Sequence, residues 1–261
     1  MDIPLYLQRI GIDSIPTVSS KALSQLTKAH LYNIPFENID VMTGNYIDLS
    51  VARFYDKIVI RKRGGFCYEL NGLFHELLRQ LGYEIMLIAA TVLQKDGSWA
   101  YPNSHAANIV YVEGEAYLVD VGFGDSCIEP VPLNGKILRD QSGTYRIKEQ
   151  EGLYYLERYE KRWRTQYCFS LVPRQLVEMK EAAHYNQTSP SSIFTQGYIL
   201  TIRTMNGRIT ITDTSITITN HRSRTKKTIH HTSEWVDFIQ YYMGIPNQEM
   251  AVIQPHLMDG S

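Results

Sequence analysis

The chain has 261 residues, of which 44% are hydrophobic and 20% are charged, and its net charge at pH 7 is -1. This composition is typical of soluble globular proteins and excludes disordered and fibrous chains. A nearly neutral chain has no overall electric field to attract nucleic acid or an anionic membrane, so we expect neither as a partner.

The N-terminal residues 1–10 lack the basic start and the apolar core of a signal peptide, and no apolar run approaches the ~18 residues of a membrane span. We therefore expect a cytoplasmic protein. The three cysteines are too few and too scattered for a disulfide framework, and no cysteine or histidine spacing is typical of zinc binding. We therefore expect no metal site.

Residues 1–84 carry apolar side chains at the spacing of helices. Ser20 and Ser50 each precede such a pattern and can cap the helix that follows. The clearest pattern is a single apolar stripe between Leu70 and Leu81, which Gly82 ends. The first part of the chain is therefore predicted to be helical.

From about residue 85 to 172 the apolar pattern shortens to that of strands. A short helical stretch over 175–183 follows, then more strands, and then a last helix from Ser233 to Gly244. We therefore expect an α+β fold built from three small subdomains. The predicted strands are Ile85–Leu93, Ala107–Val112, Ala116–Val121, Tyr154–Tyr159, Tyr198–Arg203, Arg208–Thr212 and Ser215–Thr219.

Cys67 directly precedes the apolar stripe of the third helix, so we expect it in the first turn of that helix. Unpaired backbone N–H groups and the helix dipole favour negative charge there, and the nearby cations of residues 61–63 favour it further. Gly64 and Gly65 remove two side chains just upstream and allow a close approach. Cys67 is thus a candidate nucleophile, although a buried structural cysteine is an equal alternative by position alone.

His105 and Asp120 lie on two strands that we expect to pair as a hairpin, with its turn at Glu113-Gly114. In that register Ala107 lies opposite Asp120, and His105 points to the same face as Asp120 as a diagonal neighbour. A carboxylate in an apolar strand needs a partner, and a catalytic histidine needs an orienting acceptor. The ordinary alternatives are a surface histidine and a carboxylate bound by backbone N–H groups.

The segment from His221 to Lys227 forms a local basic cluster. A solvated strand end explains it, and a contact point for a phosphorylated cofactor is the sharper hypothesis. The sequence alone does not favour the second.

Taken together, these motifs resemble the arylamine N-acetyltransferase family. The resemblance implies a helical N-terminal domain (1–84), a central β-barrel domain (85–190) and a C-terminal α/β lid (191–261) around a cysteine-protease-like core. It also implies a ping-pong transfer of an acetyl group from acetyl-coenzyme A, through a thioester, to an arylamine or arylhydrazine. The segments that carry it are Arg63–Asn71, Ile34–Asp40, Asn186–Phe194, and His105 followed by Asp120.

Carried over position by position, the resemblance makes Cys67 the nucleophile, His105 the base and Asp120 its orienting partner. It places Cys127 at the mouth of the acceptor pocket. The residues that it assigns to the aromatic acceptor pocket are Phe36, Val92, Phe123 and Phe194. Those that it assigns to coenzyme A are Asn103, Ser104 and Ser215.

The main alternative is another enzyme with cysteine, histidine and aspartate, such as a transglutaminase-like acyltransferase or a cysteine peptidase, because this triad recurs on unrelated folds. The segments 34–40 and 186–194 argue against it, since those enzymes have no reason to contain them. A binding module without chemistry is a further alternative, and an intact triad argues against that.

Overall fold

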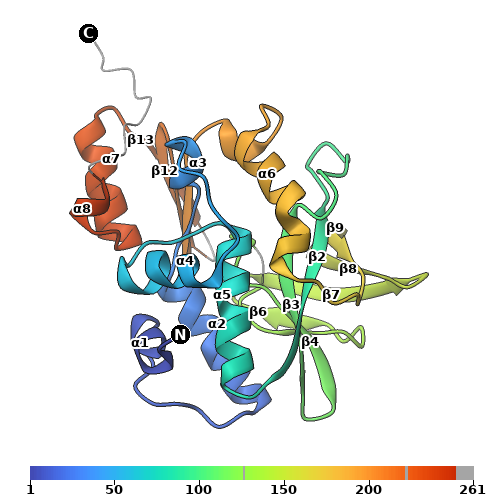
Figure 1. Cartoon of the computed structure of the whole chain (residues 1–261). Helices are drawn as coiled ribbons and strands as arrows, with labels where there is room; N and C mark the ends of the chain where they lie inside the picture. The colour runs from blue at the N-terminus through green and yellow to red at the C-terminus, as the bar shows by residue number, and fades with distance from the viewer. Residues whose placement is uncertain (126, 221–222, 251–261) are drawn as a thin grey trace.

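The computed structural model describes residues 1–125, 127–220 and 223–250, with its elements arranged as in Figure 1. The N-terminal part is mainly helical. Its two longest helices, with 14 residues each, are α2 and α5, and α5 carries the predicted apolar stripe. The bounds are α1 Ile3–Arg9, α2 Ser20–Asn33, α3 Ile39–Met42, α4 Val51–Tyr55 with a following π-helical turn Asp56–Ile60, and α5 Cys67–Gln80.

The predicted stripe forms the buried face of α5. Five of its members, from Leu70 to Leu78, are fully buried in the largest core cluster of the protein. Burial of such a side chain stabilises the fold by about 1.5–3 kcal/mol, so this one helix organises the N-terminal core. Gly82, just after the helix, has a φ of +96°, which is the left-handed conformation expected at such a stop.

The helix starts differ in detail from the prediction. The side chain of Ser19, one residue before Ser20, caps α2 by accepting a hydrogen bond from the N–H of Ala22. Ser50 holds the capping position of α4, but its side chain makes no capping hydrogen bond. Asp2 caps α1, a helix of seven residues that we did not predict because it is too short to show a clear period.

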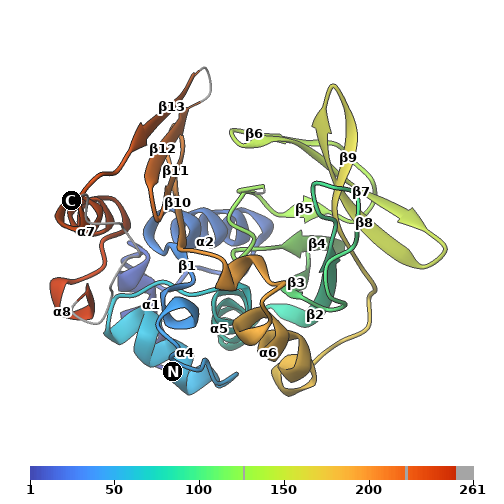
Figure 2. The same cartoon turned by 90° about the horizontal axis from the view of Figure 1, so that it is seen from above.

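The central part is an eight-stranded antiparallel sheet that curls so that β5 contacts β7, which gives a nearly closed barrel (Figure 2). The strand order is β5-β4-β3-β2-β9-β8-β7-β6. The bounds are β2 Glu84–Val92, β3 His105–Val112, β4 Glu115–Val119, β5 Val131–Pro132, β6 Leu138–Asp140, β7 Gly143–Gln150, β8 Leu153–Glu160 and β9 Arg162–Phe169.

The C-terminal part is a five-stranded antiparallel sheet in the order β1-β10-β11-β12-β13, with α7 packed on one face. Its apolar face is lined by isoleucine and leucine side chains, and Gly244 ends the last turn as predicted, with a φ of +66°. The bounds are β1 Phe36–Glu37, β10 Ile199–Thr204, β11 Gly207–Thr212, β12 Ser215–Asn220, β13 Ser223–Thr228, α7 Thr232–Phe238, a π-helical turn Ile239–Met243 and α8 Asn247–Met250.

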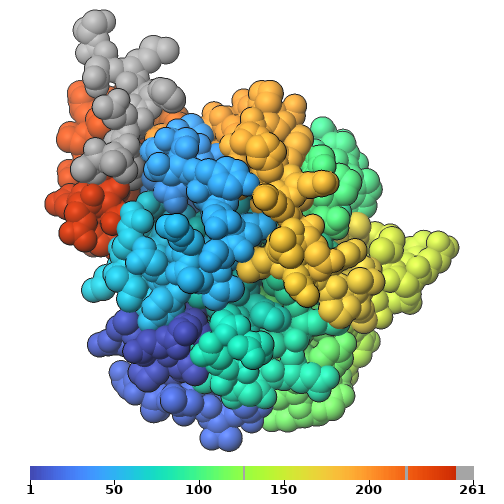
Figure 3. Space-filling view, in the orientation of Figure 1, coloured from blue at the N-terminus to red at the C-terminus, as the bar shows by residue number. Residues whose placement is uncertain are grey.

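The linking segment between the two sheets contains a 3-10 turn Leu176–Met179, α6 Lys180–Thr188 and a second 3-10 turn Ile193–Thr195. Helix α6 covers the join between the N-terminal part and the barrel, which Figure 3 shows as gold atoms against blue and green ones. Tyr185 of α6 stacks on Tyr101 before β3, with ring centroids 4.4 Å apart. This segment therefore fixes the loop that leads into His105.

The architecture is the α+β fold that the sequence predicts. One strand departs from the expected order, because β1 comes from the helical part and pairs with β10 through Phe36 and Thr201. The domain boundaries at residues 84 and 190 stay a prediction, and so do a cytoplasmic location and the lack of nucleic-acid or membrane partners. His221 and Arg222 of the basic cluster lie outside the described residues. Within the described ranges, no helix combines the length and the apolarity that a bilayer span requires.

Candidate active site

Cys67 is the first residue of α5, as predicted, and only 2% of it is exposed. Its Sγ lies 3.8 Å from the carbonyl oxygen of Ser104, which directly precedes His105. The start of the helix is fixed by Glu69, whose carboxylate accepts the N–H of Phe66 at 3.0 Å. The sulfur is thus held at a helix N-terminus next to the beginning of β3.

The two glycines before Cys67 are required by close packing. A Cβ at Gly64 would lie 2.2 Å from the carbonyl oxygen of Pro35, and one at Gly65 would lie 2.9 Å from the side chain of Glu69. Real Cβ atoms do not come this close to backbone oxygens, so a side chain at Gly64 would displace the chain.

Two of the three cations near Cys67 in sequence, Arg61 and Arg63, are paired elsewhere, which corrects one expectation. The Arg63 guanidinium lies 2.8 Å from Glu37 and 3.0 Å from Asp40. Arg61 forms an ion pair with Glu249. These two guanidinium groups therefore form ion pairs with carboxylates and not with the sulfur of Cys67.

The hairpin that carries His105 and Asp120 has the predicted register. Val112 pairs with Glu115 across the turn, and both turn residues have positive φ, 54° at Glu113 and 77° at Gly114. Such a pair of left-handed residues is typical of a two-residue hairpin turn. His105 and Asp120 consequently meet on one face, with Nε2 2.8 Å from Oδ2.

Asp120 is held by three further donors. Its Oδ1 accepts the side-chain amide of Asn71 and the N–H of Gly122, both at 2.9 Å, and its Oδ2 accepts the hydroxyl of Tyr167 at 2.9 Å. Asn71 stands four residues after Cys67, one helical turn along α5, so the helix period could have indicated it. Tyr167 lies on β9 and has no sequence signal that connects it to Asp120.

The hairpin and the helix touch at Gly122. A Cβ built there would lie 2.8 Å from the Cα of Cys67 and 2.6 Å from the amide of Asn71. The loop after Asp120 therefore packs directly on the residue that bears the sulfur.

The electrostatics of the buried pair favour an imidazolium beside a carboxylate. Burial lowers the pKa of His105, but the Asp120 carboxylate and the neighbouring Cys67 outweigh it and raise that pKa to about 10. Burial raises the pKa of Asp120, but His105 and the donors from Asn71 and Gly122 outweigh it and lower that pKa. The pair is therefore ionic at neutral pH.

The aromatic residues predicted for an acceptor pocket lie in two adjoining groups. Phe36 and Phe194 contact each other, with ring centroids 5.8 Å apart. The Phe123 ring lies edge-on to the ring of His105 at 5.3 Å, and Val92 packs against the barrel core that also borders Phe123. A Cβ at Gly124 would lie 4.0 Å from Phe36, so the two groups meet beside the loop after Asp120.

The three residues predicted to contact coenzyme A lie in two different parts of the structure, two of them before β3 and one on β12. Asn103 and Ser104 form the turn before His105, where the carbonyl oxygen of Asn103 accepts the hydroxyl of Tyr68 at 3.0 Å. The Ser104 hydroxyl is buried and has no hydrogen-bond partner among the described residues. Ser215 lies on β12, and its hydroxyl is 2.9 Å from that of Thr212.

Two further predictions concern the position of Cys127 and the presence of a metal site. Cys127 is buried in the barrel core, against which the predicted pocket residues Val92 and Phe123 also pack, and its place at the pocket mouth stays a prediction. In the portion of the chain that the structure describes, no three side chains of histidine, cysteine, aspartate or glutamate are grouped so that they could hold a metal ion.

Comparison with known proteins identifies the family. The sequence model of an N-acetyltransferase family matches residues 20–252. The arylamine N-acetyltransferase of Mycolicibacterium smegmatis is 31% identical over 261 residues, which cover 96% of this chain and 94% of that protein.

Solved structures that are similar to this chain belong to the same family. The arylamine N-acetyltransferase of Mycobacterium marinum, in complex with CoA, superposes with a TM-score of 0.89 at 28% identity, over 99% of this chain and 97% of that one. One from Bacillus cereus, whose structure reveals a Cys-His-Glu catalytic triad, has a TM-score of 0.88 at 28% identity, over 94% of this chain and 99% of that one. The chain therefore belongs to the arylamine N-acetyltransferase family of acyltransferases.

Proposed function

We propose that the protein transfers an acetyl group from acetyl-coenzyme A to the nitrogen of an arylamine or arylhydrazine, through a thioester on Cys67. The observation that carries the proposal is the buried cluster of Cys67, His105 and Asp120. The CoA complex of the M. marinum relative supports the donor, and the triad of the B. cereus relative supports this kind of site.

In the first half of the reaction Cys67 is the nucleophile. In the ionic form of the site His105 already holds the proton, so the sulfur attacks the acetyl carbonyl carbon of the donor as a thiolate beside the imidazolium. A carbon–sulfur bond forms to Cys67, and the bond to the sulfur of coenzyme A breaks. Coenzyme A leaves as its thiol after it takes the proton from His105, which leaves the imidazole neutral for the second half.

In the second half the amine attacks the carbonyl carbon of the thioester. Neutral His105 accepts the N–H proton of the amine, and Cys67 leaves as a thiolate beside the imidazolium that forms. The product is an amide, and the enzyme returns to its starting state. Both halves use the same base and the same sulfur, which is why one site suffices for a ping-pong cycle.

Asp120 orients the base. Because Nε2 of His105 is bound to the carboxylate, Nδ1 is the nitrogen that remains for the sulfur and the amine. The carboxylate is itself fixed by Asn71, Gly122 and Tyr167, so the imidazole cannot turn without breaking a buried hydrogen bond.

The adjoining aromatic groups support an aromatic acceptor. Flat apolar side chains bind an aryl ring by stacking and edge contacts, and Phe123 lies against the base itself. We assign Phe36, Phe123 and Phe194, with Val92 at the edge of the barrel, to the acceptor pocket, and Asn103 and Ser104 to the donor side.

Mass spectrometry after incubation with acetyl-coenzyme A, without an acceptor, tests the proposal. One acetyl group is expected on the peptide that contains Cys67, and addition of an arylamine should remove it. Cys67→Ala should remain folded and stay unmodified, while Cys168→Ala, a change at the partly exposed cysteine on β9, should acetylate normally. An unmodified Cys67 in the wild-type protein would refute the thioester.

The alternative of another enzyme with the same triad is disfavoured by the family match, which extends over the C-terminal sheet as well as the triad. A transglutaminase-like enzyme or a cysteine peptidase would be acylated by a peptide and not by acetyl-coenzyme A, so the same experiment separates the readings.

A further inference from the structure

Helix α6 ends in a segment that the proposed mechanism does not use, residues 186–194. Its first residue, Asn186, is only 4% exposed. The side-chain amide of Asn186 donates a hydrogen bond to the carbonyl oxygen of Ser104 at 2.9 Å, and this bond is buried. The two residues are 82 positions apart in the chain, so the bond joins α6 to the loop that leads into His105.

The same carbonyl oxygen faces the sulfur of Cys67. Two donors reach it in the described part of the chain: the Asn186 amide and the Cys67 thiol, whose Sγ lies 3.8 Å away. A thiol is a weak donor, and it can donate only while it keeps its proton. In the proposed mechanism Cys67 reacts as a thiolate, so the bond from the sulfur is lost in the reactive form.

The loss of that donor matters because the carbonyl group is buried. A buried carbonyl without a hydrogen-bond partner costs free energy, and the partial negative charge of its oxygen repels a thiolate nearby. The amide of Asn186 does not titrate, so it stays bonded to the oxygen whether or not Cys67 is ionised. It therefore keeps the carbonyl satisfied and offsets part of the charge that faces the sulfur.

Neighbouring contacts hold Asn186 in place. The hydroxyl of Ser192 donates to its backbone carbonyl at 2.9 Å. On one side of it Tyr185 stacks on the loop before β3, and on the other side the amide of Gln187 binds both backbone groups of Ile47 in the N-terminal part. The helix cannot move relative to this loop without breaking several contacts, so the amide is a fixed donor.

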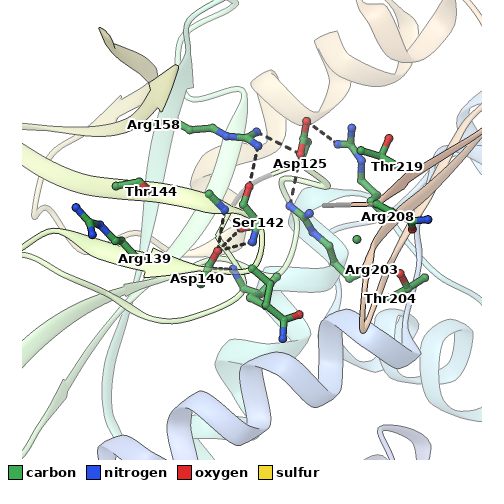
Figure 4. Close-up of a pocket in the computed structure, with 15 residues that line it drawn as sticks. Asp125, Arg139, Asp140, Ser142, Thr144, Arg158, Arg203, Thr204, Arg208 and Thr219 are labelled. Carbon is green, nitrogen blue, oxygen red and sulfur yellow. Dashed lines mark hydrogen bonds and ion pairs between the residues drawn. The ribbon is translucent and has the colours of Figure 1, made fainter. Parts of the chain in front are cut away.

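The arginines of this region pair with carboxylates away from the sulfur. Four of them line a cavity of about 530 Å³ between the barrel and the C-terminal sheet, here the arginine-lined cavity (Figure 4). Three of the four form ion pairs with Asp125, and neither Cys67 nor Ser104 belongs to the lining. A thiolate at Cys67 is therefore stabilised by groups nearer the sulfur, such as His105 and the start of α5.

We propose that Asn186 is a positioning residue for the nucleophile, which holds the Ser104 carbonyl so that Cys67 ionises more readily. The inference rests on Cys67 as the nucleophile of the function proposed above, and it adds a residue of α6 to the site. Asn186 acts through the carbonyl and not by contact with a substrate. Because Ser104 directly precedes His105, the same bond also fixes the backbone where β3 begins.

Alkylation of Cys67 by iodoacetamide at a series of pH values tests this role, because the thiolate is the species that reacts. Asn186→Leu keeps most of the side-chain volume and removes the donor. The midpoint pH of alkylation should rise by about one unit, the shift that corresponds to the loss of one buried hydrogen bond. Asn186→Ala, which adds no branched side chain, should shift it in the same direction. Peptide mass spectrometry separates Cys67 from the other two cysteines.

Gln187→Leu is the matched control. It removes an amide from the next position of the same helix and breaks the contacts with Ile47, but it leaves the Ser104 carbonyl bonded to Asn186. It should lower the free energy of unfolding and leave the midpoint of alkylation unchanged. Urea titration measures the stability of all three variants, and circular dichroism identifies any that does not fold.

A midpoint that is unchanged in the folded Asn186 variants, or that rises equally in Gln187→Leu, would overturn the proposal and reduce Asn186 to an anchor of α6. The alkylation assay contains no acetyl-coenzyme A, so it does not depend on the proposed function. A shifted midpoint together with a wild-type Cys67 that is not acetylated would refute the thioester and leave the effect of Asn186 on the sulfur in place.

Discussion

Two buried groups of charged side chains lie near the start of α5, and they differ in what their charges can do. The first, here the structural charge cluster, joins Lys57 and Arg63 to three carboxylates: Glu37, Asp40 and Glu69. The second is the pair of His105 and Asp120. Both are largely buried, and in the proposed mechanism His105 of the second group exchanges its proton during the reaction.

The structural charge cluster is permanently ionised on its cationic side. Burial lowers the pKa of Lys57, but the surrounding carboxylates outweigh it and raise that pKa, and the same holds for Arg63. Its charges fix backbone: Glu69 binds the N–H of Phe66, and Glu37 binds the N–H of Ile39 at 2.7 Å. The comparison teaches that similar burial fixes backbone geometry in the first cluster and, in the proposed mechanism, supports proton transfer in the second.

The largest effect is expected for Asp120→Asn. The substitution keeps the shape but replaces the acceptor of His105, so the imidazole loses its fixed tautomer, and kcat should fall by about 10⁴-fold. Acetyl transfer to an arylamine measures it, with circular dichroism as the control for folding. Near-normal activity would show that Asp120 is not an orienting group and would remove the distinction between the two clusters.

A pH dependence of stability follows from the raised pKa of His105. The stabilisation from its charge is complete below the unfolded value of about 6.5 and is lost as the pH rises through about 10. The free energy of unfolding of the wild type relative to His105→Gln should therefore decrease between these values. Urea titrations at several pH values measure it, and a constant difference would contradict the ionic pair.

Arg63→Met tests the structural charge cluster. Removal of the guanidinium takes away the nearest partner of Glu37 and leaves that buried carboxylate with Lys57 as its remaining cation among the described residues, 3.7 Å away, so the free energy of unfolding should fall by up to about 3–5 kcal/mol. Arg79→Met, which breaks the exposed pair with Glu76 on the far end of α5, is the control and should change stability little. Equal effects of the two substitutions would mean that burial of the cluster does not matter.

The smallest effect is expected for Tyr167→Phe, which removes one hydroxyl from Asp120 and keeps the ring. Loss of a hydrogen bond to a charged group corresponds to about 1.5–3 kcal/mol, so kcat/KM should fall by about one order of magnitude. The pH–rate profile should shift with it, because Asp120 acts on His105. An unchanged profile alongside lower stability would assign Tyr167 to packing alone.

The sequence predicts the parts of the site that depend on local rules. The stripe from Leu70 places Cys67 at a helix start, and the turn at Glu113-Gly114 sets the register that brings His105 to Asp120. Their chemical roles stay predictions. The parts that escaped prediction depend on distant contacts, such as the hydroxyl of Tyr167, 47 positions after Asp120.

Other features that the sequence did not predict also depend on contacts between residues that are distant in the chain. Arg63 pairs with Glu37 and Arg61 with Glu249, since a charged side chain is stabilised by the carboxylate that the fold supplies and not by the nearest residue in the chain. The arginine-lined cavity arises only where two sheets face each other, so no single motif indicates it.

Strand β1 also sets an order of events during synthesis. The side chain of Asn38 accepts the N–H of Ile199, 161 positions later, and Phe36 pairs with Thr201. A ribosome makes the N-terminal segment first. The edge of β1 that pairs with β10 therefore stays unpaired until the barrel strands, which lie between the two in sequence, have been synthesised. A truncated product that stops before β10 would keep that edge open, while the other edge of β1 would still pair with Gly65, two residues before Cys67.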